Sequence, residues 1–178
     1  MKIELVPLQN EDREQFIRDN QEAFRYGALE EFGVRDTHFE EEGEIISRDT
    51  ILQSIETGTA LRIVADGAVV GGMVLRVKGE QGELELLFVS PTVHSKGIGY
   101  AAWCKAEEMF PEVRVWETCT PYFEKRNIHF YVNRCGFHIV EFFHAGHPDP
   151  HMPDAGEGDD HDGMFRFQKR MEDRSSGF

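Results

Sequence analysis

Hydrophobic and polar residues alternate along the chain with two different periods. A period of two, typical of half-buried strands, occupies residues 2–8, 60–65, 68–77, 84–89, 113–118, 137–143 and 164–171. A helical period occupies residues 11–29, 48–56 and 123–135 and the stretch between Gly99 and Pro111. Strands and helices therefore alternate through most of the 178 residues. This order predicts an α/β protein and, at this length, a single domain over residues 1–178.

Capping and turn residues set the boundaries of these elements. Asn10 and Ser47 are good N-caps for the first two helices, and Gly27 could break the first one. Asp66-Gly67 between two strands is a strong signal for a tight hairpin. Gly71-Gly72 lies inside a strand, which indicates a bulge or the close approach of another backbone.

The stretch from Gly82 to Glu108 carries the strongest indication of a binding site. An apolar strand ends at Ser90-Pro91, and a short loop leads through Gly97-Ile98-Gly99 into a helix. The N–H groups and the positive dipole at a helix start suit a phosphate or pyrophosphate, and Lys96 adds a cation. One Gly-x-Gly is not the three-glycine fingerprint of a dinucleotide site, so a plain turn stays open as the alternative.

A second pattern follows downstream, Asn127-Ile128-His129-Phe130-Tyr131 and then Cys135-Gly136-Phe137. Together the two patterns resemble the GNAT superfamily of acyl-CoA-dependent N-acyltransferases. In that family the loop reads Gln/Arg-x-x-Gly-x-Gly/Ala, and His94 stands where Gln or Arg is usual. Tyr131 lies five residues before Gly136, whereas four is commoner. On a regular α-helix this difference would turn the Tyr131 side chain by about 100°.

The resemblance implies a fold, an activity and a cosubstrate. The fold would be α/β (α+β by a stricter sorting), a mixed, mostly antiparallel, twisted sheet of about seven strands with helices on both faces. The activity would be transfer of an acetyl group from acetyl-CoA to a primary amine, by direct attack in a ternary complex. The same fold also hosts members that bind CoA without catalysis, so a CoA-dependent sensor or interaction protein is the alternative.

The resemblance also gives roles to individual residues. Tyr131 would be the general acid, and Glu117 or Glu85 the general base, directly or through a water molecule. The alternatives are an ordinary core aromatic and solvated strand carboxylates. The backbone N–H of Val89 would hold the oxyanion. Further contacts to the cosubstrate would come from Phe88, Val89, His94, Ser95, Lys96, Gly97, Ile98, Gly99, Tyr100 and Asn127, of which Asn127 could instead cap its turn.

Composition limits the partners. The net charge of −14 argues against nucleic acid and against an anionic membrane surface, and it favours a cationic acceptor such as a small-molecule or peptide amine. Three cysteines without metal spacing indicate thiols in a reducing compartment, and no signal peptide or long apolar run is present, which predicts a cytoplasmic protein. A homodimer through the final strands or the first helix is compatible with the sequence.

Residues 144–163 are rich in His and Asp, and they predict a mobile acidic loop near the acceptor cleft; residues 172–178 predict a flexible tail. His and carboxylate side chains can bind a divalent metal, but no fixed zinc spacing occurs, so we expect no metal site. A metal-binding or interaction module built on this loop is the third hypothesis.

Overall fold

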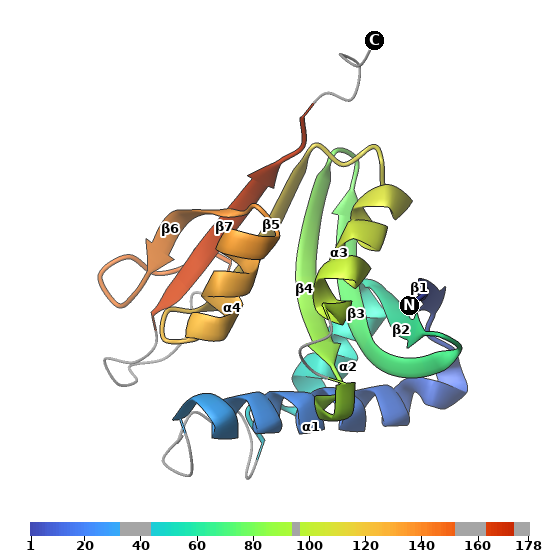
Figure 1. The fold of residues 1–178 in the computed structure, drawn as a ribbon. Helices are drawn as coiled ribbons and strands as arrows, with labels where there is room; N and C mark the ends of the chain where they lie inside the picture. The colour runs from blue at the N-terminus through green and yellow to red at the C-terminus, as the bar shows by residue number, and fades with distance from the viewer. Residues whose placement is uncertain (33–43, 94–96, 152–162, 173–178) are drawn as a thin grey trace. The chain divides into compact units, whose positions relative to one another are not determined.

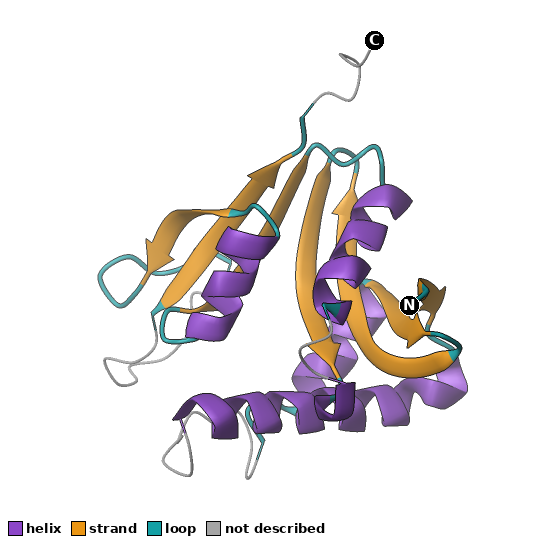
Figure 2. Ribbon diagram, viewed as in Figure 1, coloured by secondary structure: helices purple, strands orange, loops and turns teal. Residues whose placement is uncertain are grey.

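The computed structural model describes residues 1–32, 44–93, 97–151 and 163–172, with the backbone alone for residues 28–32. The described strands are β1 (Ile3–Pro7), β2 (Thr59–Ala65), β3 (Ala68–Lys78), β4 (Gln81–Val89), β5 (Val115–Pro121), β6 (His138–Phe143) and β7 (Met164–Arg170). The described helices are α1 (Arg13–Phe32), α2 (Arg48–Thr57), α3 (Ile98–Met109) and α4 (Lys125–His129), with short turns η1 (Asn10–Asp12), η3 (Pro91–Val93) and η4 (Phe130–Arg134) (Figures 1 and 2).

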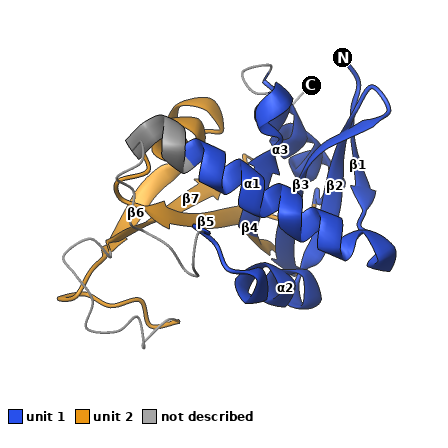
Figure 3. Cartoon of the chain, turned by 90° about the horizontal axis from the view of Figure 1, so that it is seen from below, with its two compact units in different colours: residues 1–78, 84–111 blue, residues 79–83, 112–178 orange. Residues whose placement is uncertain are grey.

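Within the described residues the strands form one seven-stranded mixed sheet in the order β1-β2-β3-β4-β5-β7-β6. The predicted sheet is confirmed. The chain divides into two compact units, residues 1–78 with 84–111 and residues 79–83 with 112–178 (Figure 3). β4 passes from the second unit to the first, so the single domain over residues 1–178 stays a prediction. No helix in the described ranges is long and apolar enough to cross a membrane.

The first unit is built on an antiparallel sheet. β1 pairs with β2, and β2 pairs with β3 through the predicted hairpin, in which Asp66 and Gly67 both have positive φ, 47° and 85°. α2 and α3 lie on opposite faces of these strands (Figure 1). α1 and α2 share one apolar core, where the rings of Phe16 on α1 and Phe88 on β4 meet edge to face at 5.0 Å.

Gly71 and Gly72 are required by close packing, as the sequence indicated. A Cβ at Gly71 would overlap the carbonyl oxygen of Phe88, and one at Gly72 would overlap the rings of Phe16 and Phe88. The register of β2 against β3 also shifts between Ile63 and Val64, opposite these glycines. Because Gly71 and Gly72 have no side chains, β3 can pack closely against the contact between the rings of Phe16 and Phe88 at the end of β4.

The second unit contains the parallel part of the sheet. Residues 81–83 of β4 pair in parallel with residues 115–117 of β5, and β5, β7 and β6 continue as antiparallel neighbours. Gly82 lies opposite Trp116, and a Cβ at this position would overlap the indole ring. The fully buried Trp116 thus occupies the space above Gly82 and holds the two strands together.

Two predicted helix boundaries are wrong, and one is confirmed. α1 begins at Arg13, because residues 10–12 form a 3₁₀ turn, so Asn10 is not its N-cap. The helix also continues through Gly27, which faces open space and does not break it. Ser47 caps α2 as predicted, and its hydroxyl accepts a hydrogen bond of 3.1 Å from the N–H of Thr50.

Candidate active site

The end of β4 is fixed by contacts to the core and to β3. The side chain of Phe88 is buried against Phe16 in the core. Only the backbone of Phe88 can therefore contact a cosubstrate. Val89, the next residue, is half-buried. The N–H of Ser90 donates to the carbonyl oxygen of Val70 at 2.7 Å, which ends the strand before η3. The predicted contacts His94, Ser95 and Lys96 lie outside the described residues.

The start of α3 has the geometry of an anion site. Gly97 is the N-cap and has a left-handed backbone conformation, with φ of 70°. A Cβ at this position would meet nothing, so glycine is favoured here by the backbone conformation and not by lack of space. The first N–H groups of a helix have no acceptor within the helix. The first turn carries no acidic residue, and Ile98 anchors it in the core while Tyr100 is exposed. This turn fits the pyrophosphate of a CoA molecule.

Glu85 on β4 is held by an arginine. Its carboxylate forms an ion pair with Arg76 on β3, and its side chain is only 13% exposed. The ion pair holds this carboxylate in place, and its burial leaves little of it accessible.

Glu117 on β5 is held by one oxygen only. Its Oε1 accepts hydrogen bonds from Nη1 of Arg166 at 2.7 Å and from Nε2 of Gln168 at 3.0 Å. Among the described residues, Oε2 of Glu117 has no hydrogen-bond partner. The carboxylate is thus oriented by β7 and keeps one oxygen available for an incoming proton.

Tyr131 is buried in the second unit, at 9% exposure, between the rings of Phe137 and Phe167. Burial raises the pKa of Tyr131, and a side-chain hydrogen bond with Thr118 opposes that rise only in part. The phenol therefore carries its proton at neutral pH. A protonated hydroxyl can donate a proton, as a general acid must.

The helix that carries Tyr131 is not a regular α-helix. Residues 130–134 form a π-helical turn in which the N–H of Cys135 donates to the carbonyl oxygen of Phe130, five residues back. Gly136 then closes the helix with φ of 82°. The expected rotation of Tyr131 by about 100° assumed 3.6 residues per turn, a period that this π-helical turn does not have, and the wider turn accommodates the additional residue before Gly136.

Two threonines anchor this helix to one face of β5. Thr118 bonds Tyr131, and the Oγ1 of Thr120 accepts a hydrogen bond of 3.1 Å from the side-chain amide of Asn127. This bond to β5 is not the cap of its own turn that the sequence offered as the alternative. Since side chains alternate along a strand, Glu117 lies on the opposite face of β5 from Thr118 and the Tyr131 helix.

Cys119 shares the face of β5 with Glu117, and its surroundings are acidic. Burial raises the pKa of Cys119 to about 11, and the nearby carboxylates of Asp149 and Glu83 contribute to the rise. The group is a thiol at neutral pH, and the thiolate is the nucleophilic form. Cys119 is therefore unsuited to carry an acetyl group as a covalent intermediate.

Comparison with known proteins adds to this geometry. The model of the acetyltransferase (GNAT) family matches residues 13–137, which is more than half of the chain. The chain belongs to the acetyltransferase (GNAT) family. It is 42% identical to the uncharacterized protein YrkN of Bacillus subtilis over 179 aligned positions, which cover 96% of this chain and 94% of YrkN.

Solved structures of GNAT-fold acetyltransferases are similar over nearly the whole chain. The PaiA N-acetyltransferase of Thermoplasma acidophilum, in complex with coenzyme A, is 18% identical with a TM-score of 0.63, covering 96% of this chain and 100% of that one. A GNAT family acetyltransferase of Elizabethkingia anophelis with acetyl-CoA bound is 13% identical with a TM-score of 0.64, covering 95% and 98%.

Membership of the GNAT family confirms the predicted fold and the predicted class of enzyme, an acetyl-CoA-dependent N-acetyltransferase. Of the predicted site residues, the structure brings Glu117, Tyr131 and Asn127 onto β5 and its helix in the second unit. It places Glu85, Phe88, Val89 and the turn of residues 97–100 in the first unit.

Sequence reasoning missed the residues that hold Glu117. Arg166 and Gln168 alternate along β7 with Phe165 and the fully buried Phe167. Polar residues at alternate positions of a buried strand indicate a polar face, and this was the signal available in the sequence. Which carboxylate they meet depends on strand pairing, which the pattern does not contain.

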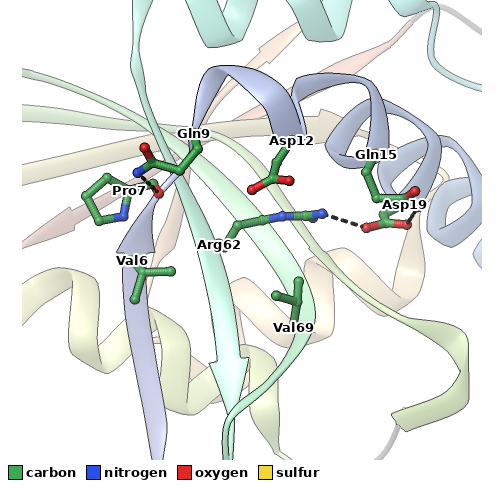
Figure 4. Close-up of a pocket in the computed structure, with 8 residues that line it drawn as sticks. All are labelled: Val6, Pro7, Gln9, Asp12, Gln15, Asp19, Arg62 and Val69. Carbon is green, nitrogen blue, oxygen red and sulfur yellow. Dashed lines mark hydrogen bonds and ion pairs between the residues drawn. The ribbon is translucent and has the colours of Figure 1, made fainter.

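A cavity in the first unit is a different site. It has a volume of about 570 Å³ and is lined by Val6, Pro7, Gln9, Asp12, Gln15, Asp19, Arg62 and Val69 (Figure 4). None of the predicted site residues lines it. Arg62 is 93% buried at its side chain, pairs with Asp19 at 3.0 Å and lies 5.4 Å from the ring centre of Phe16. The main charged pair of this cavity is thus internal, which indicates a role in stability.

The described part of the chain contains no group of three or more His, Cys, Asp or Glu side chains placed to hold a metal ion. In the His/Asp-rich segment, residues 152–162 lie outside the described residues. His144 and His147 are described, and their backbones pair with each other in a short turn.

Proposed function

We propose that the protein acetylates a primary amine by direct attack on the thioester, with Glu117 as general base and Tyr131 as general acid. The observation that carries this proposal is the buried Tyr131, protonated at neutral pH and fixed by Thr118 and the π-helical turn. The raised pKa of Cys119, about 11, supports direct attack over a route through an acetylated cysteine.

Acetyl-CoA, when bound, supplies a thioester carbonyl that a neutral amine can attack. Glu117 accepts the proton that leaves the amine as the C–N bond forms, directly or through a water molecule. Tyr131 gives its proton to the sulfur as the C–S bond breaks.

The first unit contributes binding groups in this proposal. The turn at Gly97, Ile98 and Gly99 would hold the pyrophosphate through backbone N–H groups, with Tyr100 beside it. The backbone of Phe88 and Val89 would contact the chain of the cosubstrate, and the Val89 N–H would donate to the developing oxyanion. His94, Ser95, Lys96 and Asn127 stay predicted contacts.

We propose that the acceptor is an amine with a further positive charge. Three carboxylates, those of Asp149, Glu83 and Glu117, each raise the pKa of Cys119 on the Glu117 face. The face is therefore negative in spite of Arg166, and the whole chain carries a net charge of −14. Such a field attracts a cationic substrate and weakens as salt is added.

A panel of amines tests the proposal. Release of the CoA thiol is measured with acetyl-CoA and matched pairs of amines that differ by one positive charge. We expect turnover that requires the amine, is faster for the more cationic member, and falls at least about 10²-fold in Glu117→Gln. Equal turnover of Glu117→Gln and the wild type would remove Glu117 from the role of base.

Location and assembly are further proposals. Three free thiols, Cys104, Cys119 and Cys135, support a cytoplasmic protein. The exposed apolar residues Ile139, Val140 and Phe142 lie on β6, the last strand in the sheet order, and support a homodimer through this strand. Light scattering of the wild type and Val140→Lys tests the dimer, which the lysine should break.

A further inference from the structure

A row of four charged or titratable side chains runs across β5, β7 and β6 and ends at Glu117. Arg166 donates from Nη1 to Oε1 of Glu117 at 2.7 Å and from Nε to Oε1 of Glu141 at 3.0 Å. Oε2 of Glu141 then lies 2.8 Å from Nε2 of His147. We propose that Glu141 and His147 are positioning residues for Glu117, which they control by holding Arg166. The inference rests on the proposed function of Glu117 as general base.

A β-bulge brings Glu141 into this row. Ile139 pairs with Phe167 and Glu141 pairs with Arg166, so Val140 is an additional residue in β6. In a regular pairing Val140 would lie opposite Arg166, and Glu141 would point to the other face of the sheet. The bulge therefore turns the carboxylate of Glu141 toward Arg166, a use of bulges that is common beside active sites.

His147 is itself fixed, so it can hold Glu141. Its ring stacks on Phe143 at 5.8 Å between centres and 11° between planes, and its backbone exchanges two hydrogen bonds with His144. The hydrogen bond from His147, helped by Arg166, lowers the pKa of Glu141 below its ordinary value. Glu141 consequently stays ionised, and keeps its hold on Arg166, when the solution becomes mildly acidic.

Sharing Arg166 keeps one oxygen of Glu117 available. A guanidinium and a carboxylate prefer a two-pronged contact that occupies both carboxylate oxygens. Here the Nε of Arg166 is engaged by Glu141, and only Nη1 reaches Glu117, at Oε1, where Gln168 also donates. The two-pronged contacts of arginine use Nη2 together with either Nε or Nη1. Loss of Glu141 would free the guanidinium of Arg166 to turn and present such a pair to both oxygens of Glu117. Glu141 thus prevents Arg166 from occupying both carboxylate oxygens of Glu117.

The first test needs no acceptor. In the NMR spectrum of the full chain, the Nε–H signal of Arg166, assigned by its loss in Arg166→Met, should move in Glu141→Ala and in His147→Phe. It should stay close to its wild-type position in Glu141→Gln, which keeps an acceptor oxygen, and in Glu112→Ala, an exposed glutamate of the same unit. If the Nε–H signal of Arg166 has the same chemical shift in Glu141→Ala as in the wild type, the inference is wrong.

The second test uses thiol release from acetyl-CoA with the fastest amine of the panel. We expect Glu141→Ala to lower kcat about tenfold with little change in KM for acetyl-CoA, and Glu141→Gln to keep most of the activity. Adding Arg166→Met to Glu141→Ala should restore part of the loss, because no arginine is left to capture Glu117. Further loss in the double variant would contradict the inference.

The two tests separate this inference from the proposed function. If Glu117→Gln leaves turnover unchanged while the Arg166 signal responds to Glu141→Ala, Glu117 is not the base and the row of contacts stands. The positioning role then fails with the base. If Glu117→Gln abolishes turnover and Glu141→Ala has no effect on kcat, the function stands and the positioning role alone is wrong.

Discussion

At the scale of the residue, exposure distinguishes the two carboxylates that the sequence offered as bases. Both form an ion pair with an arginine, but the side chain of Glu85 is 13% exposed and that of Glu117 is 35% exposed. The partners of Glu117 lie 49 and 51 residues further along the chain. A local pattern contains no information on contacts at that separation, so the sequence could name both candidates and could not choose between them.

Replacing Tyr131 with Phe should lower kcat at least about 10²-fold and leave the affinity for CoA within about twofold. The substitution removes the acidic proton and one hydrogen bond to Thr118, but it keeps the ring between Phe137 and Phe167. Steady-state kinetics and calorimetric titration measure the two effects. Unchanged kcat would show that another group protonates the sulfur.

The lowered pKa of Glu141 predicts a dependence of stability on pH. Its hydrogen bond from His147 favours the ionised form in the folded state, so the stabilisation is complete above the ordinary glutamate pKa of 4.5. The stabilisation should be lost as the pH falls below 4.5 through the lower folded value. The free energy of unfolding, measured with urea, should fall less steeply with decreasing pH for Glu141→Gln than for Glu112→Gln. Equal falls in the two variants would contradict the pKa shift.

At the scale of the element, two irregularities decide which side chains meet. The π-helical turn at residues 130–134 accommodates one additional residue after Tyr131, and the bulge at Val140 turns Glu141 toward Arg166. Sequence patterns located both elements, because a hydrophobic period and a terminating glycine can each be read from a short stretch of sequence. They missed the irregularities, since a pattern assumes one period throughout and each irregularity inserts one residue.

Gly82 tests how tightly β4 and β5 are paired. Ala at this position would overlap the ring of the fully buried Trp116, so Gly82→Ala should destabilise the protein by about 1–3 kcal/mol. Gly27→Ala is the matched control. It meets nothing within 4 Å in the middle of α1 and should stabilise by up to about 1 kcal/mol. Thermal unfolding that moves both variants in the same direction would contradict this packing.

At the scale of the whole molecule, the family and the sheet were within reach of the sequence. The loop before α3 and the helix of Tyr131 are short motifs, and the alternation of strands and helices gave the mixed sheet that the strand order shows. The division into two compact units was not within reach, because it depends on how many contacts cross between segments. β4 has residues in both units.

The most direct measurement is calorimetric titration of acetyl-CoA into the wild type, Gly99→Glu and Gly27→Glu. The account predicts binding by the wild type and by Gly27→Glu, which adds the same charge on α1 at a position with nothing within 4 Å of the added Cβ. Gly99→Glu should abolish binding, because its carboxylate would lie in the first turn of α3 where the pyrophosphate is held. Equal binding by all three proteins would contradict the assignment of this turn to the cosubstrate.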